Sequence, residues 1–123
     1  CIDATGLGIG WADDAKDKFG GYRVEGVTFT SGVKERLAYP VRSAMEDRKL
    51  RIPYSGAIRA DLRSITKQTT LSGNVRFTAE RTKDGHADHF WALALALQAG
   101  SSPSVPFEYF SAGLAQRDDL KGW

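Results

Sequence analysis

Two aspartates stand at positions where a carboxylate needs a partner. Asp3 closes the apolar run CIDA and is followed by three alternating glycines, Gly6, Gly8 and Gly10. Asp88 lies near the start of the otherwise apolar stretch HADHFWALALALQA. A carboxylate among apolar residues is costly unless it is paired, hydrogen-bonded or bound to a metal. Carboxylate oxygens are ligands that Mg²⁺ and Mn²⁺ prefer, so the two residues are candidate metal ligands.

The neighbours of Asp88 support the same interpretation. His86 and His89 flank it, and Asp84 and Gly85 precede it as a candidate helix cap. An Asp and a His in one helical turn provide ligands for a divalent cation. The structural alternative is an acid that is stabilised by the dipole at the start of a helix. His89, one turn beyond His86, is expected to pack at the surface.

The glycines allow a second interpretation, because a glycine-rich turn between a strand and a helix also binds dinucleotides. Here the spacing is G-x-G-x-G, whereas the dinucleotide fingerprint is G-x-G-x-x-G. An acid also stands where the fingerprint has an apolar strand end. We therefore expect the glycines to form a tight backbone turn beside a metal site.

Basic residues concentrate in the middle of the chain. Residues 34–83 contain twelve Lys or Arg against five Asp or Glu, although the whole chain carries a formal net charge of only +2. Within this region Arg59, Arg63 and Lys67 have i, i+4, i+8 spacing, which places them on one face of a helix. We predict that this face contacts the phosphates of an anionic partner such as nucleic acid. The alternative is an exposed, solvated basic face.

Bulk properties limit the class of protein. A length of 123 residues fits one domain, and 41% hydrophobic with 26% charged residues is an ordinary globular composition. A single cysteine excludes an internal disulfide framework and a cysteine-based zinc site. No apolar run approaches the roughly 18 residues of a membrane span, so we expect a soluble, intracellular protein without a membrane partner.

The first third of the chain predicts a strand, a short helix and a second strand. The expected ranges are 1–4, 11–19 and 22–30. This order is typical of a parallel βαβ unit, which brings the carboxyl end of the first strand to a ligand-binding sheet edge.

The rest of the chain predicts helices at 33–48, 55–67 and 86–99, with a hairpin at 69–80. Ser31 is the expected cap of the first of these helices, and Pro40 inside it predicts a kink or a split. We expect one partial domain over residues 1–100 and a tail or docked extension over residues 101–123.

Three segments in order carry a resemblance to a known family. CIDATGLG, then GVTFTSGVKERL with RIPYSGAIRADL, and finally GHADHFWALALALQAG are similar to the carboxyl-terminal nuclease domain of phage large terminase subunits. The likeness is to the Mu-type prophage branch and spans about residues 1–100. It implies an α/β, RNase H-like fold with a mixed sheet flanked by helices, here truncated at its N-terminal strands.

The resemblance also implies a function and a site. The family cuts viral DNA during packaging, and its two-metal chemistry uses Mg²⁺ or Mn²⁺ held by carboxylates. Carried over, the catalytic and metal residues are Asp3, Asp88 and His86, the last as a ligand or proton shuttle. A further family acid lies upstream of the strand that holds Asp3, so we expect this chain alone to be inactive.

The same resemblance implies partners. They are double-stranded DNA, an upstream ATPase domain of the same protein, and the portal and small terminase subunit, in the host cytoplasm. An unpaired edge beside residues 1–4 also predicts self-association. Two alternatives stay open, namely a non-catalytic DNA-binding or portal-docking module and another RNase H-like enzyme such as a junction resolvase or an integrase.

Overall fold

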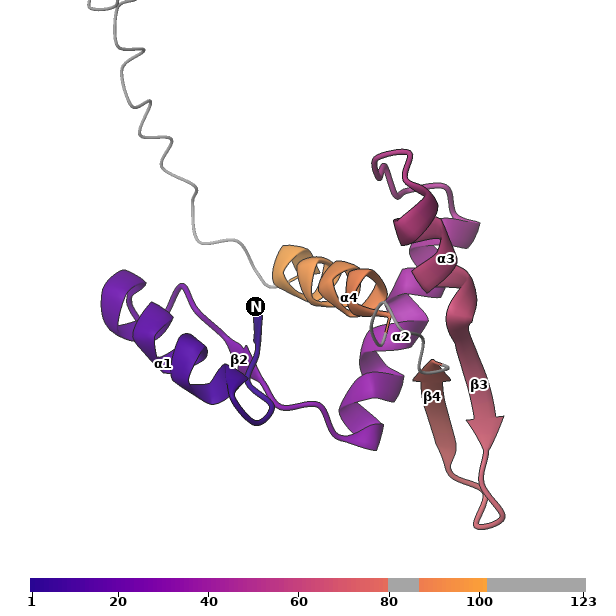
Figure 1. The fold of residues 1–123 in the computed structure, drawn as a ribbon, viewed down its shortest axis with the longest axis horizontal. Coiled ribbons are helices and arrows are strands. Elements are labelled where there is room, and N and C mark those ends of the chain that lie inside the picture. The colour runs from indigo at the N-terminus through magenta and orange to yellow at the C-terminus, as the bar shows by residue number, and fades with distance from the viewer. Residues whose placement is uncertain (80–86, 102–123) are drawn as a thin grey trace, which may run out of the picture.

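The computed structural model describes residues 1–79 and 87–101 (Figure 1). Its elements, in chain order, are β1 (Ile2–Asp3), α1 (Gly8–Phe19), β2 (Gly26–Val27), α2 (Ser31–Glu46), α3 (Gly56–Ser64), β3 (Ile65–Thr69), β4 (Val75–Ala79) and α4 (Asp88–Ser101). The predicted tail, residues 101–123, lies outside the described residues beyond Ser101.

The N-terminal part forms the predicted strand–helix–strand unit. β1 and β2 pair in parallel, with Asp3 opposite Val27. Backbone N–H groups of β1 extend this pairing at both ends, from Ile2 to the Glu25 carbonyl and from Ala4 to the Val27 carbonyl, each at 2.9 Å. The parallel βαβ prediction is confirmed, although α1 begins at Gly8 instead of residue 11 and β2 covers far less than residues 22–30.

The cap of helix α2 lies one residue earlier than predicted. The Thr30 hydroxyl accepts a hydrogen bond from the backbone N–H of Val33 at 3.2 Å, so Thr30 is the cap and Ser31 the first helical residue. Pro40 lies inside a continuous 16-residue helix, so the predicted split is wrong. The proline is exposed, while residues on an adjoining side of the helix are buried. The buried residues of α2 are Leu37, Ala38 and Val41.

Helix α3 is shorter than predicted. Ser55, the predicted first residue of the helix, is its cap, and the chain becomes extended at Ile65 (φ −72°, ψ 121°) and continues as β3. The predicted helix end at Lys67 is therefore wrong. Isoleucine and threonines favour a strand here, and pairing with β4 outweighs the helical spacing of the preceding residues.

The hairpin predicted at residues 69–80 is confirmed, but its first strand lies earlier in the chain, at Ile65–Thr69. Its arms are β3 and β4, which pair antiparallel with Ile65 opposite Ala79 and Thr69 opposite Val75. Residues 70–74 form the turn, and Gly73 there takes a left-handed φ of +81°. Glycine suits this position because it has no Cβ to clash.

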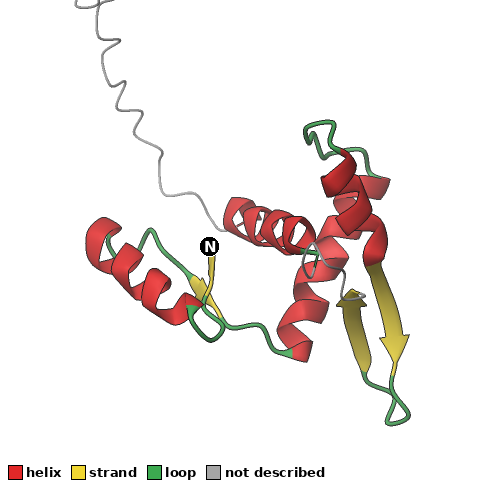
Figure 2. Cartoon of the chain, in the orientation of Figure 1, coloured by secondary structure: helices red, strands yellow, loops and turns green. Residues whose placement is uncertain are grey.

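The parallel and antiparallel pairings belong to two separate two-stranded sheets. The expected single mixed sheet is therefore not formed by the described residues (Figure 2). Within residues 1–79 and 87–101, β1 has one strand neighbour and its other edge has none. Self-association through that edge stays a prediction.

A core at the centre of the molecule joins these parts. α4 packs on both α2 and α3, while the β1–α1–β2 unit and the hairpin lie towards opposite ends (Figure 1). The buried core residues are Val27, Leu37, Ala38, Val41, Ala87, Phe90, Trp91, Ala94 and Leu95.

In the described part of the chain, no helix combines the length and apolarity that a bilayer span requires.

Candidate functional site

An open cavity of about 620 Å³ lies where the N-terminal unit, α2, β4 and α4 meet. Asp3 from β1 and Asp88 from α4 both line it, so the two acids singled out from the sequence face one cavity. Its other polar lining residues are Thr5, Lys34 and Thr78, and its apolar wall includes Trp91. The cavity thus joins residues from both ends of the described chain.

Asp3 is held by the turn that follows it. Its Oδ1 accepts a hydrogen bond from the backbone N–H of Thr5 at 2.9 Å, and the Thr5 hydroxyl accepts one from the N–H of Phe29 at 2.9 Å. Among the described residues, Oδ2 of Asp3 has no hydrogen-bond partner. One oxygen is therefore used for positioning, and the other is available to a ligand.

The tight turn depends on two of the three glycines. A Cβ on Gly8 would lie 2.0 Å from the backbone oxygen of Asp3, so α1 approaches β1 as closely as glycine allows. Gly6 takes a left-handed φ of +57°, whereas a Cβ on Gly10 would meet nothing within 4 Å. The prediction that the glycines allow a tight turn beside Asp3 is confirmed for Gly6 and Gly8.

Asp88 is the first residue of α4, and its side chain is exposed. The residue before it, Ala87, is buried and adopts a left-handed φ of +60°. The Ala87 carbonyl accepts hydrogen bonds from the N–H groups of Phe90 and Trp91, which anchors the first turn to the core. Asp88 has no hydrogen-bond or ion-pair partner within the described ranges 1–79 and 87–101.

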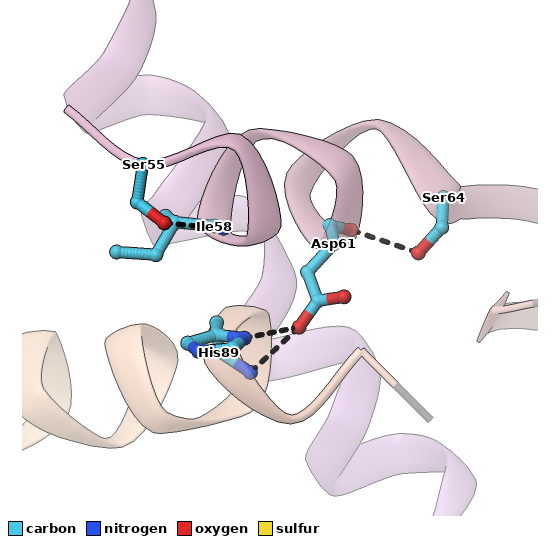
Figure 3. A network of polar contacts seen from close by, with 5 residues as sticks. All are labelled: Ser55, Ile58, Asp61, Ser64 and His89. Atoms are coloured by element: carbon cyan, nitrogen blue, oxygen red, sulfur yellow. Dashed lines mark hydrogen bonds and ion pairs between the residues drawn. The ribbon is translucent and has the colours of Figure 1, made fainter. Parts of the chain in front are cut away.

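A second acid fixes the start of α4 from outside the helix. The Asp61 carboxylate, on α3, accepts two hydrogen bonds from His89: one from the backbone N–H at 3.0 Å and one with ring Nδ1 at 2.7 Å (Figure 3). His89 is exposed, as predicted, but its bond to Asp61 was not predicted. The Asp61 carboxylate thus accepts a hydrogen bond from a backbone N–H in the first turn of α4, which has no partner within the helix. The cap predicted from Asp84 and Gly85 lies outside the described residues.

Replacing Asp61 with alanine is expected to lower the free energy of unfolding by about 1 kcal/mol, because α4 loses an acceptor at its first turn. Urea denaturation followed by tryptophan fluorescence measures the change. Asp13→Ala is the control, because Asp13 forms only an exposed pair with Lys16 at 3.4 Å. Equal effects of the two substitutions would contradict the capping role of Asp61.

Lys34 also lines the cavity, although no sequence motif pointed to it. It lies in the first turn of α2, with its ammonium 5.0 Å from the centroid of the Trp91 ring and 5.7 Å from that of Phe29. One feature of the sequence could have singled out Lys34. It is a cation near a helix N-terminus, where the helix dipole disfavours positive charge.

The chemistry of the cavity suits a hard cation. Two carboxylates and the hydroxyls of Thr5 and Thr78 are oxygen donors, the type that Mg²⁺ and Mn²⁺ prefer. No group of three potential His, Cys, Asp or Glu ligands occurs among the residues that the structure describes. His86, the third predicted ligand, lies outside those residues.

The predicted basic face is only partly a helix face. Arg59 and Arg63 are exposed on α3, whereas Lys67 lies on β3 with its ammonium 5.4 Å from the centroid of the Tyr39 ring. The prediction that Lys67 shares one helix face with Arg59 and Arg63 is wrong, because α3 ends at Ser64. None of the three basic residues lines the cavity of Asp3 and Asp88.

Comparison with known proteins identifies the family. A family model described as the terminase RNaseH-like domain matches residues 1–99. The chain belongs to this terminase RNaseH-like domain family. No curated protein and no solved structure is significantly similar to the chain.

Membership confirms the resemblance drawn from the three sequence segments. The match covers all the elements from β1 through most of α4, including both acids of the cavity. The terminase RNaseH-like domain is a nuclease-type domain, and its α/β composition agrees with the helices and two small sheets described above.

Proposed function

We propose that this terminase RNaseH-like domain is a metal-dependent DNA endonuclease, which hydrolyses phosphodiester bonds during phage DNA packaging. Asp3 and Asp88 are the proposed ligands of Mg²⁺ or Mn²⁺. The observation that supports this is their common cavity: two acids separated by most of the chain line one open space, and each has a carboxylate oxygen without a partner among the described residues.

The chain's own contribution is to hold and orient these ligands. The Thr5 N–H fixes one oxygen of Asp3, and the core contacts of Ala87 fix the turn from which Asp88 projects. Divalent ions bound by such carboxylates activate water and stabilise the leaving oxygen of a phosphodiester. His86 is the third residue of the proposed set, as ligand or proton shuttle, and a further acid upstream of Asp3 is expected to complete it.

DNA binding is assigned to exposed cations outside the cavity. Arg59 and Arg63 lie one turn apart on α3, so both can contact phosphates of one backbone. Lys67 on the adjoining strand β3 extends the same basic region. Contacts of this kind position a duplex without reading its sequence.

The proposed partners follow from the family. They are double-stranded DNA, the ATPase domain of the terminase, and the portal and small terminase subunit, all acting in the host cytoplasm. The rival proposal, a non-catalytic DNA-binding or portal-docking module, assigns the two acids a purely structural role. Metal binding separates the two proposals, because only the nuclease requires both acids to bind one cation.

Calorimetric titration of Mn²⁺ into the 123-residue chain tests the proposal. Asp3→Asn and Asp88→Asn are each expected to lower the Mn²⁺ affinity at least about tenfold. Substitution of a residue that only hydrogen-bonds a metal ligand already has an effect of this size. Asp14→Asn is the matched control, because Asp14 is exposed on α1 and does not line the cavity. Equal affinity for all four proteins would contradict the nuclease proposal.

A further inference from the structure

Lys34 places a positive charge inside the cavity that contains the two acids. Its side chain is half-buried, and its ammonium lies over the faces of two aromatic rings, 5.0 Å from Trp91 and 5.7 Å from Phe29. The rings themselves pack against each other, with centroids 5.4 Å apart. Cation–π contacts of this kind restrict a lysine that would otherwise be free to move.

The local structure of α2 does not favour a cation at this place. Lys34 lies in the first turn, where the exposed amide groups give the helix a positive end. Within the described ranges, the ammonium has no carboxylate within ion-pair distance, because neither Asp3 nor Asp88 forms a salt bridge with it. The lysine is therefore held in the cavity by aromatic faces and keeps its hydrogen-bond donors.

We propose that Lys34 binds a non-bridging oxygen of the nucleic-acid phosphate that enters this cavity. The inference rests on the proposed nuclease function and adds a phosphate-binding residue to it. Two carboxylates alone repel a polyanion, whereas an ammonium with its three donors attracts it as a point charge. Lys34 differs from Arg59 and Arg63 because it lines the same cavity as the two acids and they do not.

The alternative role for Lys34 is to balance the negative charge of Asp3 and Asp88. The two roles predict different measurements. A phosphate contact contributes to the salt dependence of DNA binding, whose log–log slope falls by about 0.9 for each phosphate that the protein no longer neutralises. Charge balance affects the affinity of the acids for a cation and leaves the salt dependence of DNA binding unchanged.

The experiment measures binding of the 123-residue chain to a short fluorescent duplex by anisotropy, in EDTA, over a series of salt concentrations. Lys34→Met keeps the apolar stem against the rings and removes the charge. It is expected to weaken binding about tenfold, the scale of a hydrogen bond to a charged group. The salt slope is expected to fall by about 0.9. Lys34→Arg is expected to retain the wild-type slope.

Lys49→Met is the matched control, because Lys49 lies just beyond the other end of α2 and pairs with Asp47 at 2.9 Å. It is expected to leave affinity and slope unchanged. Near-ultraviolet circular dichroism of the tryptophans checks the fold of each variant. A Lys34→Met slope equal to that of the wild type would overturn the inference, as would an increase in Mn²⁺ affinity without any change in DNA binding.

Failure of this inference is distinguishable from failure of the proposed function. If Lys34→Met binds DNA as the wild type does, while Asp3→Asn and Asp88→Asn lose Mn²⁺ affinity, only the role of Lys34 is wrong. If the wild-type chain itself binds no duplex, the inference is contradicted, and the Mn²⁺ titration still decides the proposed function.

Discussion

Asp88→Asn is expected to abolish DNA cleavage by the natural protein that contains this chain, with a loss of rate of about 1,000-fold or more. Asparagine keeps the shape of the side chain and removes the negative charge that a metal ligand needs. Metal ions supply several kcal/mol of transition-state stabilisation, and each 1.36 kcal/mol corresponds to about a tenfold change in rate. Conversion of supercoiled plasmid to nicked and linear forms in Mn²⁺ measures the effect.

A structural role for Asp88 predicts a different pattern. An acid at the start of α4 interacts favourably with the helix dipole, so the substitution would then lower the free energy of unfolding by about 0.3–1 kcal/mol and leave cleavage intact. Asp14→Asn, on the exposed side of α1, controls for the loss of one negative charge. Wild-type cleavage by Asp88→Asn would favour the docking-module proposal.

Gly8→Ala is expected to lower the free energy of unfolding by about 1–3 kcal/mol, the range observed when an atom is forced into a packed site. The new Cβ would lie 2.0 Å from the Asp3 carbonyl oxygen, so either β1 or the start of α1 must move. Because Asp3 ends β1, the same displacement is expected to weaken Mn²⁺ binding. Urea denaturation and calorimetry measure the two effects.

Gly10→Ala provides a matched control in the same helix. A Cβ at Gly10 meets nothing within 4 Å, and alanine is favoured over glycine in helices by up to about 1 kcal/mol. Gly10→Ala is therefore expected to stabilise the chain slightly and to leave Mn²⁺ affinity unchanged. A destabilisation by Gly10→Ala as large as that by Gly8→Ala would show that the close contact at Asp3 is not the cause.

Local sequence patterns were sufficient to predict most elements and the two acids of the cavity. Asp3 was identifiable because an acid ends an apolar strand before a glycine turn, and Asp88 because it begins an apolar helix. The parallel pairing of β1 and β2 followed from the strand–helix–strand order. These predictions depend on short-range features, which the sequence displays directly.

The errors arise where tertiary contacts decide between two local patterns. The spacing of Arg59, Arg63 and Lys67 fits a helix, yet Ile65–Thr69 forms a strand because it pairs with β4. Asp61 and Lys34 were missed for a similar reason. Their roles depend on His89 and Trp91, which are distant in sequence and approach only in the folded chain.

Anomalous diffraction from crystals of the chain grown with Mn²⁺ locates the bound ion itself, and so decides whether the two acids share one metal. We expect an anomalous peak in the cavity, within coordination distance of carboxylate oxygens of both Asp3 and Asp88. A peak bound elsewhere, or by only one of these two acids, would contradict the proposal that they form one metal site.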